Sequence, residues 1–417
     1  QSLIDSGFSQ ALIRKQDRTE TDNNTVFYFN IIVSALLYLI LYISAPLVAD
    51  FYNTPQLCPV MRVVCFSIIF NSLAVVQRAL LTIRIDFKTQ AKAALIAVVT
   101  SGVVGITMAY HGFGVWSLVT QQLLYLCMNT CFLWLLSKWR PRLMYSWQSF
   151  HELFAFGSKL LASGLLDTVY RNIYPIAIGK LFSASNLGHY TRAQHFSEFP
   201  SSNITGIIQR VTYPVLCEIQ NDDASLARGY RKILKLSAFV IFPLMTVLSA
   251  VSQPLVNKML GPQWDFCGLL LHIICFSMMW HPIHAINLNL LQVKGRPDLF
   301  LRIEIIKKAL GVSVLCITAP YGLIVMCYGQ IFNSLVALTI NTYYTGKLIH
   351  VGFFRQMRDL LPTIALCLAM FALILTVNHF ISSDVGIFIG MAFYISSSRI
   401  FKFSELTEIL SLLRRKS

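Results

Sequence analysis

Residues 185–223 read SNLGHYTRAQHFSEFPSSNITGIIQRVTYPVLCEIQNDD, a stretch that combines the length of a membrane span with an unusual number of polar side chains. Its polar residues recur at steps of three and four, so a helix aligns them in one stripe. The stripe consists of Arg192, His195, Glu198, Ser202, Gly206 and Gln209. A charged residue near the centre of a bilayer costs about 2.5–3.5 kcal/mol, so such residues usually face a protein interior or a water-filled path. We therefore expect this helix to line a translocation path, with apolar residues such as Phe199 and Ile207 on its other face.

The composition of the 417-residue chain is that of a membrane protein. It is 55% hydrophobic and 13% charged, whereas soluble domains are about 45–50% apolar and about 25% charged. The net charge of +15 comes from basic residues in short loops between apolar segments, which fits membrane topology and not a nucleic-acid partner. The ten cysteines include no CxxC pair and read as small buried hydrophobic residues.

Apolar segments of roughly 20 residues recur along the whole chain, and we count about twelve. They are Val26–Val48, Cys58–Ile83, Ala91–Tyr110, Val115–Ser137, Gly157–Phe182, Leu187–Leu216, Leu234–Leu255, Phe266–Leu291, Leu301–Ala319, Leu323–Thr345, Leu361–Phe380 and Val385–Ile400. The predicted fold is an all-α polytopic membrane protein.

Basic residues alternate between loops, which predicts an orientation. Arginine and lysine gather before the first span and then in every second loop, ending in the tail Arg414-Arg415-Lys416. Lys258 is the one basic residue inside the intervening loops, with Lys180 near one of them. Because short cytoplasmic loops carry an excess of Lys and Arg, we expect the loop before the first span and the C-terminus to be cytoplasmic.

Three segments resemble one known family. They are GHYTRAQHFSEFPSSNITGIIQRVTYPVLCEIQND (188–222), FPLMTVLSAVSQPLVNKMLGPQW (242–264) and INLNLLQVKGRPDLFLRIEIIKKALG (286–311). They are similar to the Wzx-type polysaccharide or lipopolysaccharide biosynthesis flippases of the multidrug/oligosaccharidyl-lipid/polysaccharide (MOP) exporter superfamily, in particular those of Bacteroides-like bacteria. The resemblance covers nearly the whole chain to about Asp359, and the last two spans are generic.

The resemblance implies two pseudo-symmetric six-helix lobes followed by a final helix pair, about fourteen helices in an intact member. Two further spans are then expected before Gln1. The implied domains are an incomplete first lobe (1–140), a second six-helix lobe (141–350), and the final pair with a basic cytoplasmic tail (351–417).

The resemblance also implies a function. Members move undecaprenyl-diphosphate-linked oligosaccharide repeat units across the bacterial inner membrane, for lipopolysaccharide, capsule or exopolysaccharide synthesis, by alternating access between the lobes. Expected partners are this lipid-linked oligosaccharide, membrane lipids, and a glycan polymerase and glycosyltransferases of the same pathway. The resemblance therefore implies a transporter and not an enzyme.

Such a substrate needs cations for its diphosphate and hydroxyl or amide groups for its sugars, and the fork of an arginine suits phosphate. The candidate cavity residues are Arg171, Arg192, Arg78, Arg210, Ser202 and Gln209. For Arg78 and Arg210 we favour a second reading, in which long basic side chains snorkel to the headgroups or anchor the cytoplasmic ends of the spans.

Three residues are candidates for coupling to an ion gradient. Asp167 stands four residues before Arg171, so a helix places both on one face, either as a coupling site or as an internal ion pair. Glu198 can carry a proton in a low-dielectric site. His195 fits a proton relay or a hydrogen-bonded structural role. Pro200 in the same helix is expected to kink it.

The sequence offers weak support for metal binding or for a nucleotide-binding phosphate loop. His281-Pro-Ile-His284 is a poor metal signal because Cys, Asp and Glu are missing nearby, and the chain has no GxxxxGK[ST] phosphate loop. We expect no catalytic residue, no metal and no cofactor. The alternatives to a flippase are an ion-coupled multidrug exporter of the same superfamily and a membrane-embedded glycan polymerase or ligase. An enzyme of the latter kind is expected to need a sizeable exterior loop.

Overall fold

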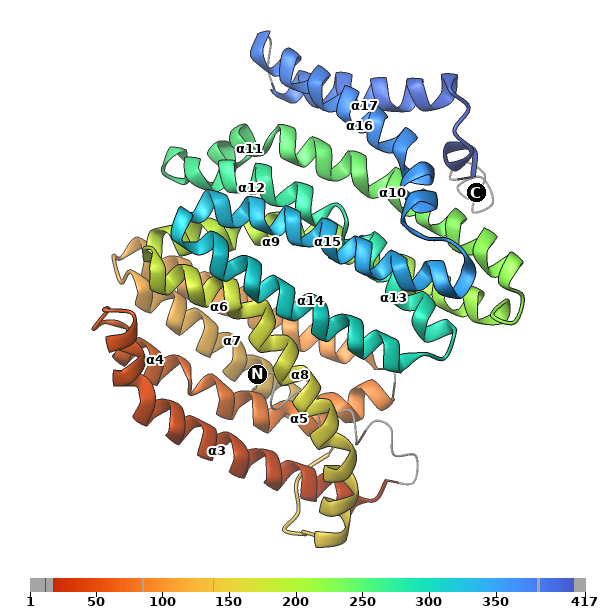
Figure 1. The fold of residues 1–417 in the computed structure, drawn as a ribbon. Helices are drawn as coiled ribbons and strands as arrows, with labels where there is room; N and C mark the ends of the chain where they lie inside the picture. Colours follow the sequence, from red (N-terminus) through yellow and green to blue (C-terminus); the bar gives the residue numbers. More distant parts are fainter. Residues whose placement is uncertain (1–11, 13–17, 85, 138, 381–382, 409–417) are drawn as a thin grey trace. The chain divides into compact units, whose positions relative to one another are not determined.

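The structure, a computed structural model, describes residues 12, 18–84, 86–137, 139–380 and 383–408. These residues form helices and short connections, with no strand among them. The helices are α3 (Glu20–Phe51), α4 (Leu57–Val64), α5 (Ser67–Ile83), α6 (Phe87–Tyr110), α7 (Val115–Leu136), α8 (Trp147–Leu181), α9 (Ala184–Glu218), α10 (Asp223–Ala250), α11 (Ser252–Leu260), α12 (Asp265–Met278), α13 (His281–Val293), α14 (Pro297–Thr318), α15 (Leu323–Ile349), α16 (Phe353–Phe380) and α17 (Ser383–Ile400). The predicted all-α class is therefore confirmed (Figure 1).

Within the described residues, eight segments are long and apolar enough to cross a membrane. They are α3, α4 with α5, α6, α7, α10, α12 with α13, α15 and α16. Helix α17 is apolar but shorter, and α8, α9 and α14 are long but more polar. The count of twelve spans therefore stays a prediction that includes these four helices.

Two of the expected spans are broken. The α-helix that begins at Leu57 is interrupted between α4 and α5 at Cys65 and Phe66, and the later one is interrupted between α12 and α13 at Met279 and Trp280. Sequence periodicity missed both breaks because apolar residues continue through them.

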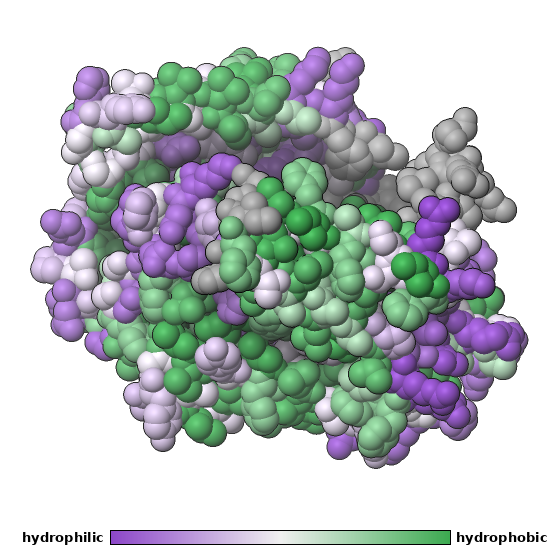
Figure 2. Space-filling view, turned by 90° about the horizontal axis from the view of Figure 1, so that it is seen from above, coloured by the Kyte–Doolittle hydropathy of each residue, from purple (hydrophilic) through white to green (hydrophobic). Residues whose placement is uncertain are grey.

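The exposed surface of the helices includes many large apolar side chains. On α3, Ile43 and Leu47 are 66% and 72% exposed, far more than a soluble core helix would allow for such side chains. In the space-filling view hydrophobic side chains cover most of the middle of the visible face, and hydrophilic ones gather toward its ends (Figure 2). This distribution suits helices surrounded by lipid.

The chain forms two compact units, Gln1–Asn172 and Ile173–Ser417, called unit 1 and unit 2 below. The predicted domain limits at residues 140 and 350 stay predictions.

In unit 1, helices α3, α5 and α7 pack through small residues and buried polar contacts. Ser34 Oγ donates to Ser72 Oγ at 2.9 Å, which joins α3 to α5. Trp134 Nε1 donates to the Leu73 carbonyl at 2.9 Å, and Thr130 Oγ1 donates to the Phe70 carbonyl at 3.0 Å. Both bonds tie α7 to carbonyls in the first half of α5. A buried polar group that is hydrogen-bonded avoids a desolvation cost, so these bonds fix the register of the three helices.

Unit 2 has a larger apolar core, built from α9, α10, α12, α13, α15, α16 and α17. Tyr230, Phe242 and Leu270 are among its largest fully buried side chains. Helix α10 begins at its N-cap Asp222, whose carboxylate accepts hydrogen bonds from the Ala224 and Ser225 amides. Two hydrogen bonds from Ser225 hold the pKa of the Asp222 carboxyl below its usual range. The bond from the Ser225 hydroxyl has the larger effect on this pKa, and the bond from its amide comes second.

Helices α16 and α17 approach closely at two glycines of α17. A Cβ atom added to Gly386 would collide with the Asn378 side chain, and one added to Gly390 would collide with the Ile374 side chain. The spacing Gly386-x-x-x-Gly390 is the small-residue pattern that lets membrane helices pack tightly. The sequences of the last two spans carry no family resemblance, but α16 and α17 therefore have a specific packing contact.

Candidate functional site

Helix α9 carries most of the predicted site residues. Its N-cap is Ser183, whose Oγ accepts from the Asn186 amide at 3.1 Å. The helix then continues to Glu218 through Pro200. Proline removes one backbone hydrogen bond, yet the helical assignment is not interrupted there.

The buried edge of α9 includes several small polar residues and one tyrosine. Ser201 Oγ donates to the Met278 carbonyl at the end of α12, at 2.8 Å. Thr205 Oγ1 lies 3.5 Å from His281 Nδ1 on α13. Gln330 Nε2 on α15 donates to the Tyr190 hydroxyl at 2.6 Å. This edge was missed from the sequence, although Ser197, Ser201 and Thr205 recur at steps of four.

The predicted stripe borders the exposed face of α9. Arg192 and His195 are exposed, and Glu198 is half-buried. Phe199, at 73% exposure, shares the exposed face, so the prediction that apolar residues lie opposite the stripe is wrong for Phe199 and also for Ile207 at 56%. The helix exposes basic and apolar side chains together.

Two residues of the stripe already have partners within unit 2. Ser202 Oγ donates to the Glu198 carbonyl one turn earlier, at 2.7 Å. Gln209 Nε2 donates to Asn289 Oδ1 on α13, at 3.2 Å. Their polar groups are therefore less available to a ligand than the side chains of Arg192 and His195.

The remaining predicted residues are only partly described. Arg171 is exposed on α8, while the side chains of Asp167 and Arg210 lie outside the described residues. Arg78 belongs to unit 1, where its Nη2 donates to Asn71 Oδ1 at 3.1 Å. The roles of all the predicted site residues stay predictions.

Helix α13 carries polar side chains toward three different helices. His281 points to α9, as described above, while His284 Nε2 lies 3.0 Å from Ser334 Oγ on α15. Asn341 Nδ2, also on α15, lies 3.1 Å from His284 Nδ1. The two histidines thus turn to different neighbours.

The same helix meets α16 through a pair of buried amides. Asn287 Nδ2 donates to Gln356 Oε1, and Gln356 Nε2 donates to Asn287 Oδ1, both at 3.2 Å. Gln356 Nε2 also lies 3.0 Å from Thr345 Oγ1. All three side chains are fully buried, so this cluster fixes how α13, α15 and α16 pack.

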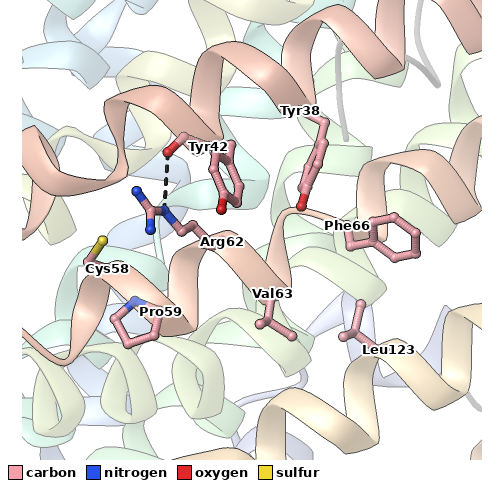
Figure 3. Close-up of a pocket in the computed structure, with 8 residues that line it drawn as sticks. All are labelled: Tyr38, Tyr42, Cys58, Pro59, Arg62, Val63, Phe66 and Leu123. Atoms are coloured by element: carbon pink, nitrogen blue, oxygen red, sulfur yellow. Dashed lines mark hydrogen bonds between the residues drawn. The ribbon is translucent and has the colours of Figure 1, made fainter.

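Unit 1 contains a pocket of about 430 Å³ between α3, α4 and α7. Arg62 lies in it beneath Tyr42, with its guanidinium carbon 4.4 Å from the centre of the ring (Figure 3). Tyr38, Val63, Phe66 and Leu123 supply much of the remaining lining, and none of the lining residues is acidic. Sequence reasoning missed Arg62, whose signal is a lone arginine inside an apolar segment.

Two curated relatives resemble this chain. The teichuronic acid biosynthesis protein TuaB of Bacillus subtilis (strain 168) is 26% identical over 91% of this chain and 80% of its own length. The lipopolysaccharide biosynthesis protein WzxC of Escherichia coli (strain K12) is 23% identical over 82% of this chain and 69% of its own length.

Solved structures share the fold. The lipid II flippase MurJ in an inward closed conformation has a TM-score of 0.78, with 13% identity over 96% of this chain and 88% of that chain. An inward-facing multidrug resistance MATE family transporter of the MOP superfamily has a TM-score of 0.65, with 15% identity over 83% and 87%. These likenesses confirm the predicted two-lobe α fold of a multi-pass membrane protein.

The family resemblance predicted from three sequence segments is likewise confirmed. A family model described as "Polysaccharide biosynthesis protein" matches residues 1–269, more than half of the chain. The chain therefore belongs to the polysaccharide biosynthesis protein family.

Proposed function

We propose that this protein is a flippase that moves lipid-linked oligosaccharide repeat units across the bacterial inner membrane. The observation that carries the proposal is the surface of α9, where Arg192 and His195 are exposed beside Phe199 on a long helix of a membrane protein. An exposed guanidinium next to apolar surface suits a ligand that is both anionic and lipid-linked. Family membership and the flippase fold of MurJ support the same function.

The substrate-contact residues that we propose are Arg171, Arg192, Arg78, Arg210, Ser202 and Gln209. Arg192 ranks first because its side chain is exposed, whereas Gln209 and Ser202 have partners within unit 2. Asp167, Glu198 and His195 are the proposed coupling residues for a proton or sodium gradient.

The proposed function implies a carrier lipid, partner enzymes and an orientation in the membrane. The carrier would be undecaprenyl diphosphate, and a glycan polymerase and glycosyltransferases would act before and after transport. The loop before α3 and the C-terminus would face the cytoplasm, where basic loop residues are favoured.

A second candidate is a multidrug exporter, favoured by the likeness to the MATE transporter. The exposed Arg192 argues for an anionic ligand and therefore against the cationic drugs that such an exporter could take. An enzyme that joins glycans is disfavoured because the described connections between helices are short.

The test is deletion of the gene in its host, followed by measurement of lipid-linked repeat units in each leaflet. The proposal predicts that these units accumulate on the cytoplasmic face and that the normal gene restores export. Arg192→Ala and Arg171→Ala are expected to restore it poorly, whereas Arg355→Ala, at an exposed arginine of α16, should restore it fully. Normal export in the deletion strain would contradict the proposal.

A further inference from the structure

The pocket of unit 1 has a cation inside an apolar segment. Arg62 lies five residues after the start of α4, and Tyr42 lies nine residues before the end of α3. At 1.5 Å per residue, both are about 8–13 Å from the helix ends. An arginine inside an apolar membrane segment is costly unless it has a partner, reaches the interface or binds a ligand.

Part of its role is structural. Pro46 of α3 has no N–H, so the Tyr42 carbonyl four residues earlier lacks its usual helical donor. Arg62 Nε supplies a replacement, donating to that carbonyl at 3.4 Å (Figure 3). The ring of Tyr42 stacks against the same guanidinium at 4.4 Å. These two contacts fix the plane of the guanidinium.

The terminal nitrogens of Arg62 remain available. A guanidinium has five N–H groups, and Nε accounts for one. Among the described residues no acceptor is hydrogen-bonded to Nη1 or Nη2, and no carboxylate forms an ion pair with Arg62. The hydroxyl groups of Tyr38 and Tyr42 both point toward α4 (Figure 3), and both residues line the same pocket as Arg62. The pocket therefore contains several hydrogen-bond donors.

We propose that this pocket binds the phosphate group of a lipid headgroup. The Nη edge of a fixed guanidinium matches two phosphate oxygens at once. The tyrosine hydroxyls add donors, and Phe66, Val63 and Leu123 provide an apolar wall for the attached chain. A volume of about 430 Å³ lies within the range of small-molecule sites, about 300–1,000 Å³. The inference does not depend on the proposed transport of a lipid-linked oligosaccharide.

Native mass spectrometry of the purified full-length protein tests this inference. The probes are dioleoyl phosphatidic acid, undecaprenyl diphosphate, and diolein, which lacks phosphate. We expect both phosphate-bearing lipids to bind at least tenfold more tightly than diolein. Similar affinity of the two would identify the bound group as lipid phosphate in general, and a clear preference for undecaprenyl diphosphate would identify a carrier-lipid site. Equal binding of diolein would overturn the proposal.

Variants assign the binding to the pocket. Arg62→Gln is expected to weaken the binding of the phosphate-bearing lipids about tenfold, and Tyr38→Phe to weaken it less. The control is Arg355→Gln, because Arg355 also donates to a backbone carbonyl, that of His350 at 2.8 Å, but is exposed. If Arg62→Gln fails to fold, Arg62→Lys replaces it, since lysine keeps the charge and loses the fork. Unchanged binding in the Arg62 variant, or an equal loss in the control, overturns the proposal.

Discussion

The buried amides Asn287 and Gln356 show how single residues specify unit 2. Each donates to the other across α13 and α16, and both are inaccessible to solvent. A polar pair of this kind contributes modestly to stability when it is complete, but removing one member leaves the side-chain oxygen of the other without the donor that this pair supplies. Its main effect is to exclude other registers of these helices.

A double-mutant cycle measures this pair. Gln356→Leu should lower the free energy of unfolding by about 1–3 kcal/mol, because the buried Asn287 Oδ1 then loses its hydrogen-bond donor. The double variant Asn287→Leu/Gln356→Leu should lose less than the sum of the two single variants. Thermal unfolding in detergent gives the values, and Gln292→Leu, at an exposed amide of α13, is the control. Strictly additive losses would show that the two amides do not interact.

At the scale of elements, helix α9 illustrates how one helix divides its surface. Tyr190, Ser201 and Thr205 contact α15, α12 and α13, while Arg192 and His195 remain exposed. The predicted stripe lies at the border between these two faces. Small hydroxyl residues therefore mark the packed edge of this helix, and its exposed face carries Arg192 and His195 together with apolar side chains such as Phe199.

The glycines of α17 provide a test at the same scale. Gly390→Val should destabilise the α16–α17 pair by about 1–3 kcal/mol, since the new side chain would collide with Ile374. Gly102→Val on α6 is the matched control, because a Cβ atom there meets nothing within 4 Å. Melting temperatures in detergent compare the two variants. Equal effects of the two substitutions would mean that the close approach at Gly390 contributes nothing.

At the scale of the whole molecule, composition and apolar run length predicted the all-α membrane class. The long apolar segments were recognisable because a bilayer demands about 20 apolar residues per helix. The breaks at Cys65–Phe66 and Met279–Trp280 could not be predicted, because apolar residues continue through both turns.

The candidate site was predicted less completely. Periodicity identified Arg192 and His195 as polar positions of one helix, and both are exposed. It could not reveal that Gln209 pairs with Asn289, or that Pro46 leaves a carbonyl for Arg62, because these contacts join residues far apart in the chain. Such partnerships depend on the packing of helices and not on local pattern.

Reconstituted transport tests the central claim most directly. The protein expressed from its complete gene is placed in vesicles with a fluorescent lipid-linked oligosaccharide, and a membrane-impermeant quencher reports the leaflet. The account predicts exchange between leaflets well above that of protein-free vesicles, and a clear loss with Arg192→Ala but not with Arg355→Ala. Exchange no faster than in protein-free vesicles would contradict it.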